Sequence, residues 1–368
     1  MNKDNRPVLI MAGGTGGHVF PALAVAQEIL SRNIPVVWLG THQGIESRLI
    51  PAAGIPIEWV SVSGLRGKRM SRLFKAPFML LLSAWQCFRI MLRIKPRVVL
   101  GMGGFVTGPG GVMARLTGKP LCIHEQNAIA GMTNRYLSRL TDHVMQAFPH
   151  SFPADIHAQT IGNPVREDIN QIPEPSQRLG QRQGPIRLLV LGGSLGAQAL
   201  NELVPQALAL LPTEQRPIVK HQTGERNLEA AHLHYQQAGV DKDIEVLPFI
   251  DDMAQAYAWS DLVICRAGAL TVSELMVAGV AALLVPYPYA VDDHQTRNAE
   301  FLVKAGAGLL IQQADLNADK LHALLAGLIN DRSRLLDMAN AAYVLANRQA
   351  TRDVADLCLQ VGESADDR

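Results

Sequence analysis

Short apolar runs alternate with longer amphipathic stretches along most of the 368-residue chain. Most of the runs are apolar at consecutive positions rather than at every second one, which is typical of strands buried on both faces. The stretches between them, for example 22–30 and 132–140, have the length and spacing of helices. This alternation predicts parallel sheets wrapped by helices. We predict strands over residues 8–11, 36–39, 57–62, 98–102, 121–124, 143–146, 187–191, 218–222, 244–249, 262–265, 282–285 and 309–311.

Two successive series of this kind predict an α/β protein with two Rossmann-like domains. A polar segment with three prolines, residues 162–184, separates the series and is the predicted linker. We place the N-terminal domain at residues 1–165, the C-terminal domain at 166–345 and a C-terminal tail at 346–368. Because open α/β sheets bind ligands at the carboxyl ends of their strands, two such domains facing one another are expected to hold a ligand in the cleft between them.

Composition is that of an ordinary globular protein, with 48% hydrophobic and 18% charged residues. The four cysteines have no metal-ligand spacing and are expected to be reduced core residues. The most lipid-like stretch, 76–85, is much shorter than the roughly 20 residues of a membrane-spanning helix. Residues 1–165 contain 17 Lys and Arg against 7 Asp and Glu (+10), and residues 166–368 contain 17 against 26 (−9). The first domain is therefore expected to face an anionic partner.

Glycine clusters follow several of the predicted strands, at residues 13–17, 101–104, 108–111 and 192–196. Glycine permits tight turns, and it also lets backbone N–H groups at a helix N-terminus approach an anion closely. Tight-turn geometry could explain any single loop, whereas clusters in both domains favour diphosphate binding.

Two common nucleotide motifs do not fit these loops. His18 stands where a P-loop has its second glycine, and Val19 stands where the dinucleotide fingerprint has its third. The second predicted strand is followed by no acidic residue that could bind an adenine ribose. The diphosphate is therefore not expected to belong to NAD.

A second chemical cluster begins where the strand 262–265 ends. Gly268 precedes a predicted helix, whose N-terminus suits a phosphate. Glu274 lies about one turn into this helix, where its carboxylate could accept hydrogen bonds from both hydroxyls of a ribose. The alternative is a solvated first-turn acid that the helix dipole favours. Gln295 and Asn298 lie three residues apart on one helical face, and their amides suit sugar hydroxyls.

Seven motifs in order resemble a known family: GGTGGHVFPALA, GMGGFVTGPGG, HEQNAIAGMTNR, GNPVR, GGSLGAQ, FIDDM and RAGALTVSE, within residues 7 to about 325. The chain is similar to the bacterial N-acetylglucosaminyltransferases of glycosyltransferase family 28 that form lipid II in peptidoglycan synthesis. The resemblance implies a GT-B fold and inverting transfer of GlcNAc from UDP-GlcNAc to the C4 hydroxyl of undecaprenyl-diphosphate-MurNAc-pentapeptide (lipid I). It also implies an acceptor-side, membrane-associating first domain, a donor-side second domain that binds UDP-GlcNAc, and a tail that packs back on the first domain. The same resemblance implies a role in cell wall biogenesis, cell shape and cell division.

The resemblance implies a set of UDP-GlcNAc contacts, position by position. Around 287–298 this chain has one residue more than some relatives, which leaves His294 as an alternative to Gln295. We expect no cofactor, no essential metal and no nucleic-acid partner; the acidic pairs at 251–252 and 292–293 are adjacent and form no D-x-D motif. The implied contacts are Thr15, Gly16, Gly17, Asn127, Arg166, Ser194, Ile250, Ala269, Leu270, Thr271, Val272, Ser273, Glu274 and Gln295.

Inverting transfer requires a base for the incoming hydroxyl and stabilisation of the departing diphosphate. His18 is the candidate base, because an imidazole with a pKa of about 6.5 suits proton removal at neutral pH. A histidine that only positions the acceptor is the alternative. Glu125 is the competing carboxylate, while His124 ends a buried strand and is expected to be structural. Arg166 and helix N-termini are expected to stabilise the diphosphate.

Residues 64–97 combine apolar and basic side chains with no Asp or Glu. A core-facing helix with basic flanks is one interpretation. A surface for anionic lipid is the other, and we favour it because solvated faces normally mix charges of both signs. Together with a lipid-linked acceptor, it predicts a peripheral protein on the cytoplasmic face of the bacterial inner membrane. The predicted surface comprises Arg69, Arg72, Leu73, Phe74, Lys75, Phe78 and Trp85.

Two other functions are compatible with these motifs. A UDP-GlcNAc 2-epimerase shares the fold and the nucleotide sugar, and it would turn over UDP-GlcNAc without an acceptor. A non-catalytic protein that binds a nucleotide sugar or a lipid diphosphate would not turn over at all.

Overall fold

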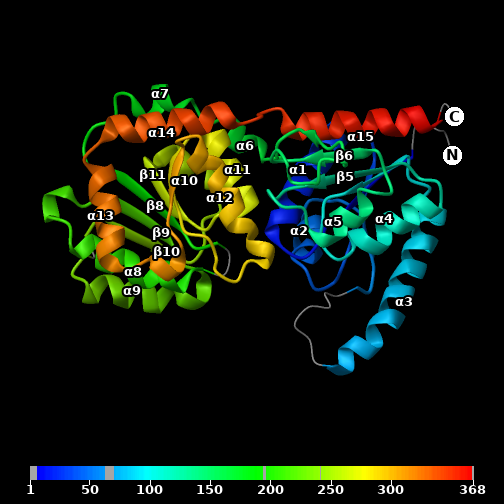
Figure 1. Cartoon of the computed structure of the whole chain (residues 1–368), viewed down its shortest axis with the longest axis horizontal. Coiled ribbons are helices and arrows are strands. Elements are labelled where there is room, and N and C mark those ends of the chain that lie inside the picture. Colours follow the sequence, from blue (N-terminus) through cyan, green and yellow to red (C-terminus); the bar gives the residue numbers. More distant parts are fainter. Residues whose placement is uncertain (1–5, 63–69, 194–195, 241, 367–368) are drawn as a thin grey trace. The chain divides into compact units, whose positions relative to one another are not determined.

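The computed structural model describes residues 6–62, 70–193, 196–240 and 242–366, and the chain divides into two compact α/β units (Figure 1). The first comprises Met1–Arg166 together with Asn347–Arg368, and the second comprises Glu167–Ala346. Each unit is built on its own parallel sheet. The predicted pair of Rossmann-like α/β domains is therefore confirmed.

Within the described residues, the sheet of the first unit has the strand order β3-β2-β1-β4-β5-β6-β7. The order reverses between β1 and β4, and ligands of open α/β sheets bind beside such a reversal, at the carboxyl ends of the strands. The strands are β1 (Val8–Met11), β2 (Val36–Gly40), β3 (Ile57–Trp59), β4 (Val98–Gly101), β5 (Leu121–Glu125), β6 (His143–Gln146) and β7 (Gln159–Thr160). The helices are α1 (Gly16–Ser31), α2 (Glu46–Ala52), α3 (Met70–Ile94), α4 (Thr107–Leu116), α5 (Met132–Leu137) and α15 (Ala350–Asp366).

The sheet of the second unit has the order β10-β9-β8-β11-β12-β13 over its described residues, with the reversal between β8 and β11. Figure 1 shows α8 and α9 on one side of this sheet and α11 and α12 on the other. The strands are β8 (Arg187–Leu191), β9 (Ile218–Gln222), β10 (Ile244–Leu247), β11 (Leu262–Cys265), β12 (Ala281–Leu284) and β13 (Gly308–Leu310). The helices are α6 (Glu167–Asn170), α7 (Pro175–Leu179), α8 (Gln198–Ala209), α9 (Leu228–Gln237), α10 (Met253–Trp259), α11 (Ala269–Ala278), α12 (His294–Lys304), α13 (Ala318–Ile329) and α14 (Arg332–Leu345).

Alternate residues of β1 belong to two apolar clusters, one on each face of the first sheet. Val8 and Ile10 lie in the cluster that α1 and α15 cover, whereas Leu9 and Met11 lie in the cluster that α3 and α4 cover. All four side chains are fully buried. Burial on both faces explains why β1 is apolar at every position. It also makes α15, the last helix of the chain, part of the core around the first strand.

The structure changes some of the predicted boundaries. Helix α1 begins at Gly16 rather than at residue 22, because Thr15 takes the extended N-cap conformation and Pro21 is tolerated inside the helix. Helix α5 ends at Leu137 rather than at 140. The two-residue strand β7 was not predicted, since both of its residues are exposed and polar. The four cysteines are free and buried, as expected.

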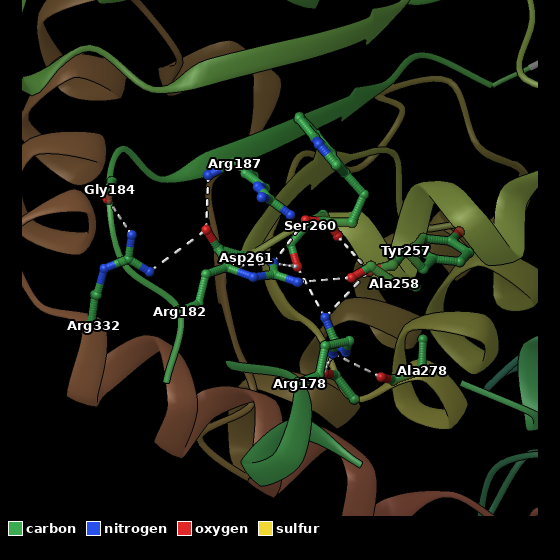
Figure 2. A network of polar contacts seen from close by, with 12 residues as sticks. Arg178, Arg182, Gly184, Arg187, Tyr257, Ala258, Ser260, Asp261, Ala278 and Arg332 are labelled. Carbon is green, nitrogen blue, oxygen red and sulfur yellow. Dashed lines mark hydrogen bonds and ion pairs between the residues drawn. The ribbon is translucent and has the colours of Figure 1, made fainter. Parts of the chain in front are cut away.

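Most of the predicted linker 162–184 is folded onto the second unit. It contains α6 and α7, and Arg178 at the end of α7 bonds to two helix C-termini (Figure 2). The Arg178 guanidinium donates to Ser260 O (3.0 Å), just after α10, and to Ala278 O (3.1 Å), in the last turn of α11. A cation at the C-terminus of a helix interacts favourably with the helix dipole. Burial lowers the pKa of Arg178 to about 10.

A second arginine of the same segment pairs with a buried carboxylate. Arg182 contacts Asp261 (2.6 Å), which is 2% exposed and also accepts a bond from Arg187 N (2.8 Å). Figure 2 shows that this ion pair and the Arg178 bonds form one network. The boundary between the two units, after Arg166, falls inside the predicted linker. Residues 167–184 nevertheless belong to the second unit, where Arg178 and Arg182 bind backbone carbonyls and a buried acid.

Candidate active site

The glycine loops after β1 and β4 pack directly against each other at the reversal point of the first sheet. A Cβ on Gly104 would lie 2.3 Å from Gly13 O, and its φ is +85°, so only glycine fits there. Thr107 closes the second loop by donating from Oγ1 to Gly103 O (2.8 Å). Tight-turn geometry therefore explains part of the glycine content.

A buried carboxylate occupies one side of the first glycine loop. Glu46, which is fully buried, accepts hydrogen bonds from Gly14 N (3.0 Å) through Oε2 and from Thr41 N (3.0 Å) through Oε1. The N–H group of Gly14 therefore binds a carboxylate, and the prediction that this loop presents its N–H groups to a diphosphate is wrong at Gly14. Nothing in the sequence around Glu46 indicated this role.

The predicted donor contacts Thr15, Gly16 and Gly17 form the N-terminus of α1. Thr15 is exposed, and its side chain makes no capping hydrogen bond. Gly16 and Gly17 are half-buried and occupy the first two helical positions. The structure thus places all three at a helix N-terminus that adjoins the reversal point, where an anion is favoured.

His18 lies in the first turn of α1 and is half-buried. Its ring packs on Gly103, where a Cβ would come within 2.6 Å of Nδ1. Nδ1 lies 2.9 Å from Gln126 Oε1. On the same helix, the Phe20 ring lies below the guanidinium of Arg166, at 6.0 Å. Two predicted site residues therefore lie at the start of α1: His18 belongs to its first turn, and Arg166 packs on Phe20 of the same helix.

Glu125 ends β5 and is only 2% exposed. Its Oε1 accepts from Asn127 N (3.0 Å) and Asn127 Nδ2 (3.2 Å), and its Oε2 accepts from Gly131 N (3.0 Å) and Asn134 Nδ2 (2.9 Å). Both carboxylate oxygens thus stabilise the conformation of residues 126–134 and fix the position of Asn127, a predicted donor contact. This geometry favours a structural role for Glu125 over that of a base.

His124, also on β5, is fully buried, and its Nε2 donates to Gly162 O (2.9 Å). Burial lowers its pKa to about 4. Its surroundings agree with the structural role expected from its position in a buried strand.

In the second unit, the loops after β8 and β10 are joined by Gln222 at the end of β9. Gln222 donates from Nε2 to Gly193 O (3.1 Å) and accepts from Ile250 N (3.3 Å), and it is 5% exposed. The predicted contact Ile250 is itself 9% exposed. Ser194 lies outside the described residues. Sequence reasoning missed Gln222, since a strand-end glutamine has no distinctive pattern.

Helix α11 presents its N-terminus beside the reversal point of the second sheet. Its first internal hydrogen bond runs from Val272 N to Gly268 O (2.9 Å), so the N–H groups of residues 269–271 have no acceptor within the helix. Ala269, Val272 and Ser273 are buried, whereas Leu270 and Thr271 are half-buried. The predicted contacts of this run thus surround a helix end that suits a phosphate.

Glu274 is 6% exposed, and its Oε2 accepts a hydrogen bond from Tyr257 Oη at 3.0 Å. Tyr257 belongs to α10 and is fully buried. The interpretation of Glu274 as a solvated first-turn acid is therefore wrong. A carboxylate that is kept buried at this edge of the sheet fits the role of binding hydroxyl groups.

The two amides of α12 have different surroundings. Gln295 is half-buried and accepts from Tyr287 N (2.9 Å), which fixes the loop before the helix. Asn298 is fully buried and donates to Ala267 O (3.1 Å). Asn298 therefore stabilises the backbone just after β11, and its buried amide is not available to a sugar hydroxyl. The prediction that Asn298 binds a sugar is wrong. The neighbouring His294 bonds to Val291 O (2.7 Å).

Helix α3 is apolar on two faces. Its inner face, with Cys87 and Met91, is fully buried against the first sheet. On the other face, Phe78 is 76% exposed and Trp85 is 54% exposed. A core-facing helix therefore explains one face only. The exposed apolar residues of α3 and the adjacent α4 are Phe78, Leu80, Leu81, Leu82, Trp85, Phe88, Leu92, Val112 and Leu116; we call them the apolar patch.

The basic side of this surface is partly described. The Arg89 guanidinium lies 4.9 Å above the Trp85 ring, at the edge of the apolar patch. Arg69 lies outside the described residues, and so do the side chains of four other members of the predicted surface: Arg72, Leu73, Phe74 and Lys75. Within the part of the chain that the structure describes, no helix has the length and apolar character needed to cross a bilayer.

Two family models match the chain. The N-terminal domain of glycosyltransferase family 28 matches residues 8–146, and the C-terminal domain of the same family matches residues 187–358. Together they extend over the β1–β6 part of the first sheet and over the whole of the second.

Curated relatives and a solved structure are similar over nearly the full length. A UDP-N-acetylglucosamine–N-acetylmuramyl-(pentapeptide) pyrophosphoryl-undecaprenol N-acetylglucosamine transferase of Nitrosococcus oceani is 56% identical over 354 residues, 96% of this chain and 98% of the relative. The protein of the same description from Marinobacter nauticus is 55% identical over 359 residues, 98% of each chain. The crystal structure of Acinetobacter baumannii MurG matches with a TM-score of 0.85 and 44% identity, covering 96% of this chain and 99% of that one.

Proposed function

The chain belongs to glycosyltransferase family 28, and we propose that it forms lipid II by transferring GlcNAc from UDP-GlcNAc to lipid I. The family resemblance and the GT-B fold expected from the sequence are both confirmed. One observation carries the activity: relatives more than half identical, matched over 96% or more of this chain, are described as this N-acetylglucosamine transferase. None of these relatives is described as an epimerase or as a binding protein.

UDP-GlcNAc is proposed to bind the second unit at the reversal point between β8 and β11. Two features support this assignment. The first turn of α11 offers N–H groups to the diphosphate, and the buried carboxylate of Glu274 offers acceptors to the ribose hydroxyls. The other expected contacts, including Ile250 and Gln295, keep their assigned roles in this proposal.

The proposed reaction is a single displacement at C1 of GlcNAc. His18 takes the proton from the C4 hydroxyl of the muramyl sugar, and the freed oxygen forms a bond to C1. The bond from C1 to the β-phosphate oxygen breaks at the same time, and its electrons leave with UDP, so the α-linked donor gives a β-linked product. Arg166 and helix N-termini stabilise the charge on UDP, without an essential metal.

The apolar patch of α3 and α4 is proposed to attach the protein to the membrane that holds its lipid-linked acceptor. Amphipathic surfaces of this kind place apolar side chains at the level of the headgroups, and nearby cations attract anionic lipid. The net charge of +10 over residues 1–165 supports the same partner. This surface gives the protein its proposed place on the cytoplasmic face of the inner membrane.

The decisive experiment is a transfer assay with radiolabelled UDP-GlcNAc. Label is expected to enter the lipid fraction only when lipid-linked muramyl pentapeptide is present. A new UDP-sugar that forms without acceptor would replace this proposal with an epimerase, and binding without turnover of either substrate would replace it with a binding protein.

A further inference from the structure

Three side chains and one backbone carbonyl of the first unit form a chain of hydrogen bonds that ends at His18. His124 Nε2 lies 2.9 Å from Gly162 O, Gln126 Nε2 lies 3.1 Å from His124 Nδ1, and Gln126 Oε1 lies 2.9 Å from His18 Nδ1. His124 and Gln126 are both fully buried. None of the motif assignments above gives Gln126 a role.

Two backbone carbonyls fix the direction of every bond in this chain. Because Gly162 O can only accept, Nε2 of His124 carries the hydrogen, and Nδ1 of the neutral ring has the lone pair. Burial lowers the pKa of His124 to about 4, so the ring is neutral at pH 7. The Gln126 amide nitrogen lies 3.1 Å from His124 O, a second group that can only accept. The nitrogen therefore faces His124, and the oxygen faces His18.

The hydrogen bond between Gln126 and His18 can therefore run in only one direction. Gln126 Oε1 has no hydrogen to donate, so Nδ1 of His18 must donate to it. A neutral imidazole carries one hydrogen on its two nitrogens, so when Nδ1 of His18 carries it, Nε2 has a free lone pair and can accept a proton. We propose that Gln126 is a positioning residue that holds His18 as the Nδ1–H tautomer, which leaves Nε2 as the atom that accepts the sugar proton. The catalytic part of this inference rests on the function proposed above.

The backbone at Gly103 also restricts the position of the His18 imidazole ring. Gly103 has a φ of +101°, and any Cβ there would lie 2.6 Å from His18 Nδ1. The ring thus lies against a bare backbone on one side and bonds to the amide of Gln126. The amide is neutral, so it selects a tautomer without adding a buried charge beside the base.

The tautomer can be measured directly by NMR. The full-length protein is labelled with ¹⁵N-histidine, and long-range ¹H–¹⁵N spectra are recorded at neutral pH, with the His18 signals assigned through His18→Gln. The native protein is expected to show the Nδ1–H pattern for His18. Gln126→Met removes the acceptor and is expected to shift His18 toward the Nε2–H pattern.

A matched control separates this role from a general loss of stability. Gln146 is another buried glutamine of the first unit, and it bonds to Thr160 Oγ1 and to Ser151 N rather than to a histidine. Gln146→Met is expected to lower the melting temperature about as much as Gln126→Met does, while the His18 tautomer stays Nδ1–H.

Kinetics test the catalytic consequence. Gln126→Met is expected to lower kcat by about 10-fold or more, because Nε2 of His18 would then carry a hydrogen and could not accept the sugar proton. The KM for UDP-GlcNAc is expected to change little, because the donor contacts remain. An Nε2–H pattern in the native protein, or an unchanged tautomer in Gln126→Met, would overturn the inference. If the native protein lacks transferase activity while the tautomer behaves as described, the proposed function fails and the positioning role of Gln126 stands.

Discussion

Truncating Glu274 should weaken the binding of UDP by an amount set by the hydrogen bonds of one buried carboxylate. The side chain is 6% exposed, so its bonds to a ribose would be shielded from water. Loss of a charge-assisted pair of hydrogen bonds costs about 1.5–3 kcal/mol, which corresponds to a rise in Kd of roughly 10- to 150-fold. Glu274→Ala also removes the acceptor that Tyr257 Oη uses at 3.0 Å, and we expect a loss of about 1 kcal/mol in the free energy of unfolding.

Calorimetric titration with UDP and with 2′-deoxy-UDP isolates the ribose contact from the rest of the site. The native protein should bind UDP more tightly than 2′-deoxy-UDP, and Glu274→Ala should bind the two with nearly equal affinity. Tyr257→Phe leaves the carboxylate in place and should keep a preference for UDP. Glu229→Ala removes the same charge from an exposed position of the second unit, and its UDP affinity should be native.

Two results would refute the assignment. Native UDP affinity in a folded Glu274→Ala variant would show that the carboxylate makes no contribution to the donor. An undiminished preference for UDP over 2′-deoxy-UDP would show that Glu274 acts elsewhere than at the ribose 2′-hydroxyl.

Four further predictions follow from the site and its surroundings. His18→Ala should lower turnover by roughly 10²–10⁴-fold with little change in donor affinity; near-native turnover would leave His18 as a positioning group at most. Transfer should persist in excess EDTA, because the proposed mechanism assigns stabilisation of the diphosphate to Arg166 and helix N-termini; loss that magnesium reverses would reveal a required metal. Binding to vesicles should need anionic lipid and fall with salt; co-sedimentation indifferent to lipid charge, or to three charge reversals that leave UDP binding intact, would exclude this surface. The three reversals are Arg69→Glu, Arg72→Glu and Lys75→Glu. Burial lowers the pKa of His124 to about 4 and that of His221 to about 3, so the unfolded chain binds more protons below pH 6.5, and each histidine should remove about 3 kcal/mol of stability between pH 6.5 and pH 4. His221→Phe should therefore lose less stability than the native chain over that range in urea unfolding, and an equal loss would contradict the reasoning.

Local pattern was enough to predict the strands, because a strand buried on both faces leaves a continuous apolar run. The same logic predicted the ligand-binding edges, since glycine clusters follow the strands beside each reversal point. It failed for β7, whose two exposed residues leave no pattern. Polarity also did not indicate that residues 167–184 belong to the second unit, where Arg178 and Arg182 bind buried partners.

Contacts between distant residues could not be predicted from one sequence. Glu46 holds Gly14 across 32 positions, and Gln126 holds His18 across 108. Each of these side chains would suit a solvated surface equally well, and only the fold brings it to its partner. The sequence therefore identified the groups proposed to touch the substrate, whereas the groups that orient them required the structure.

The position of α15 has a consequence for the order in which the protein is made. Val354 and Cys358 complete the apolar cluster that contains Val8 and Ile10, yet the whole second unit, Glu167–Ala346, is translated between them. At about 5–20 residues per second, a ribosome needs roughly 10–40 s to make those residues. During this time the first unit lacks one of the two helices that cover this face of its sheet. The half that is synthesised first is thus completed last, and the nascent chain carries an unfinished core that a chaperone would be able to bind.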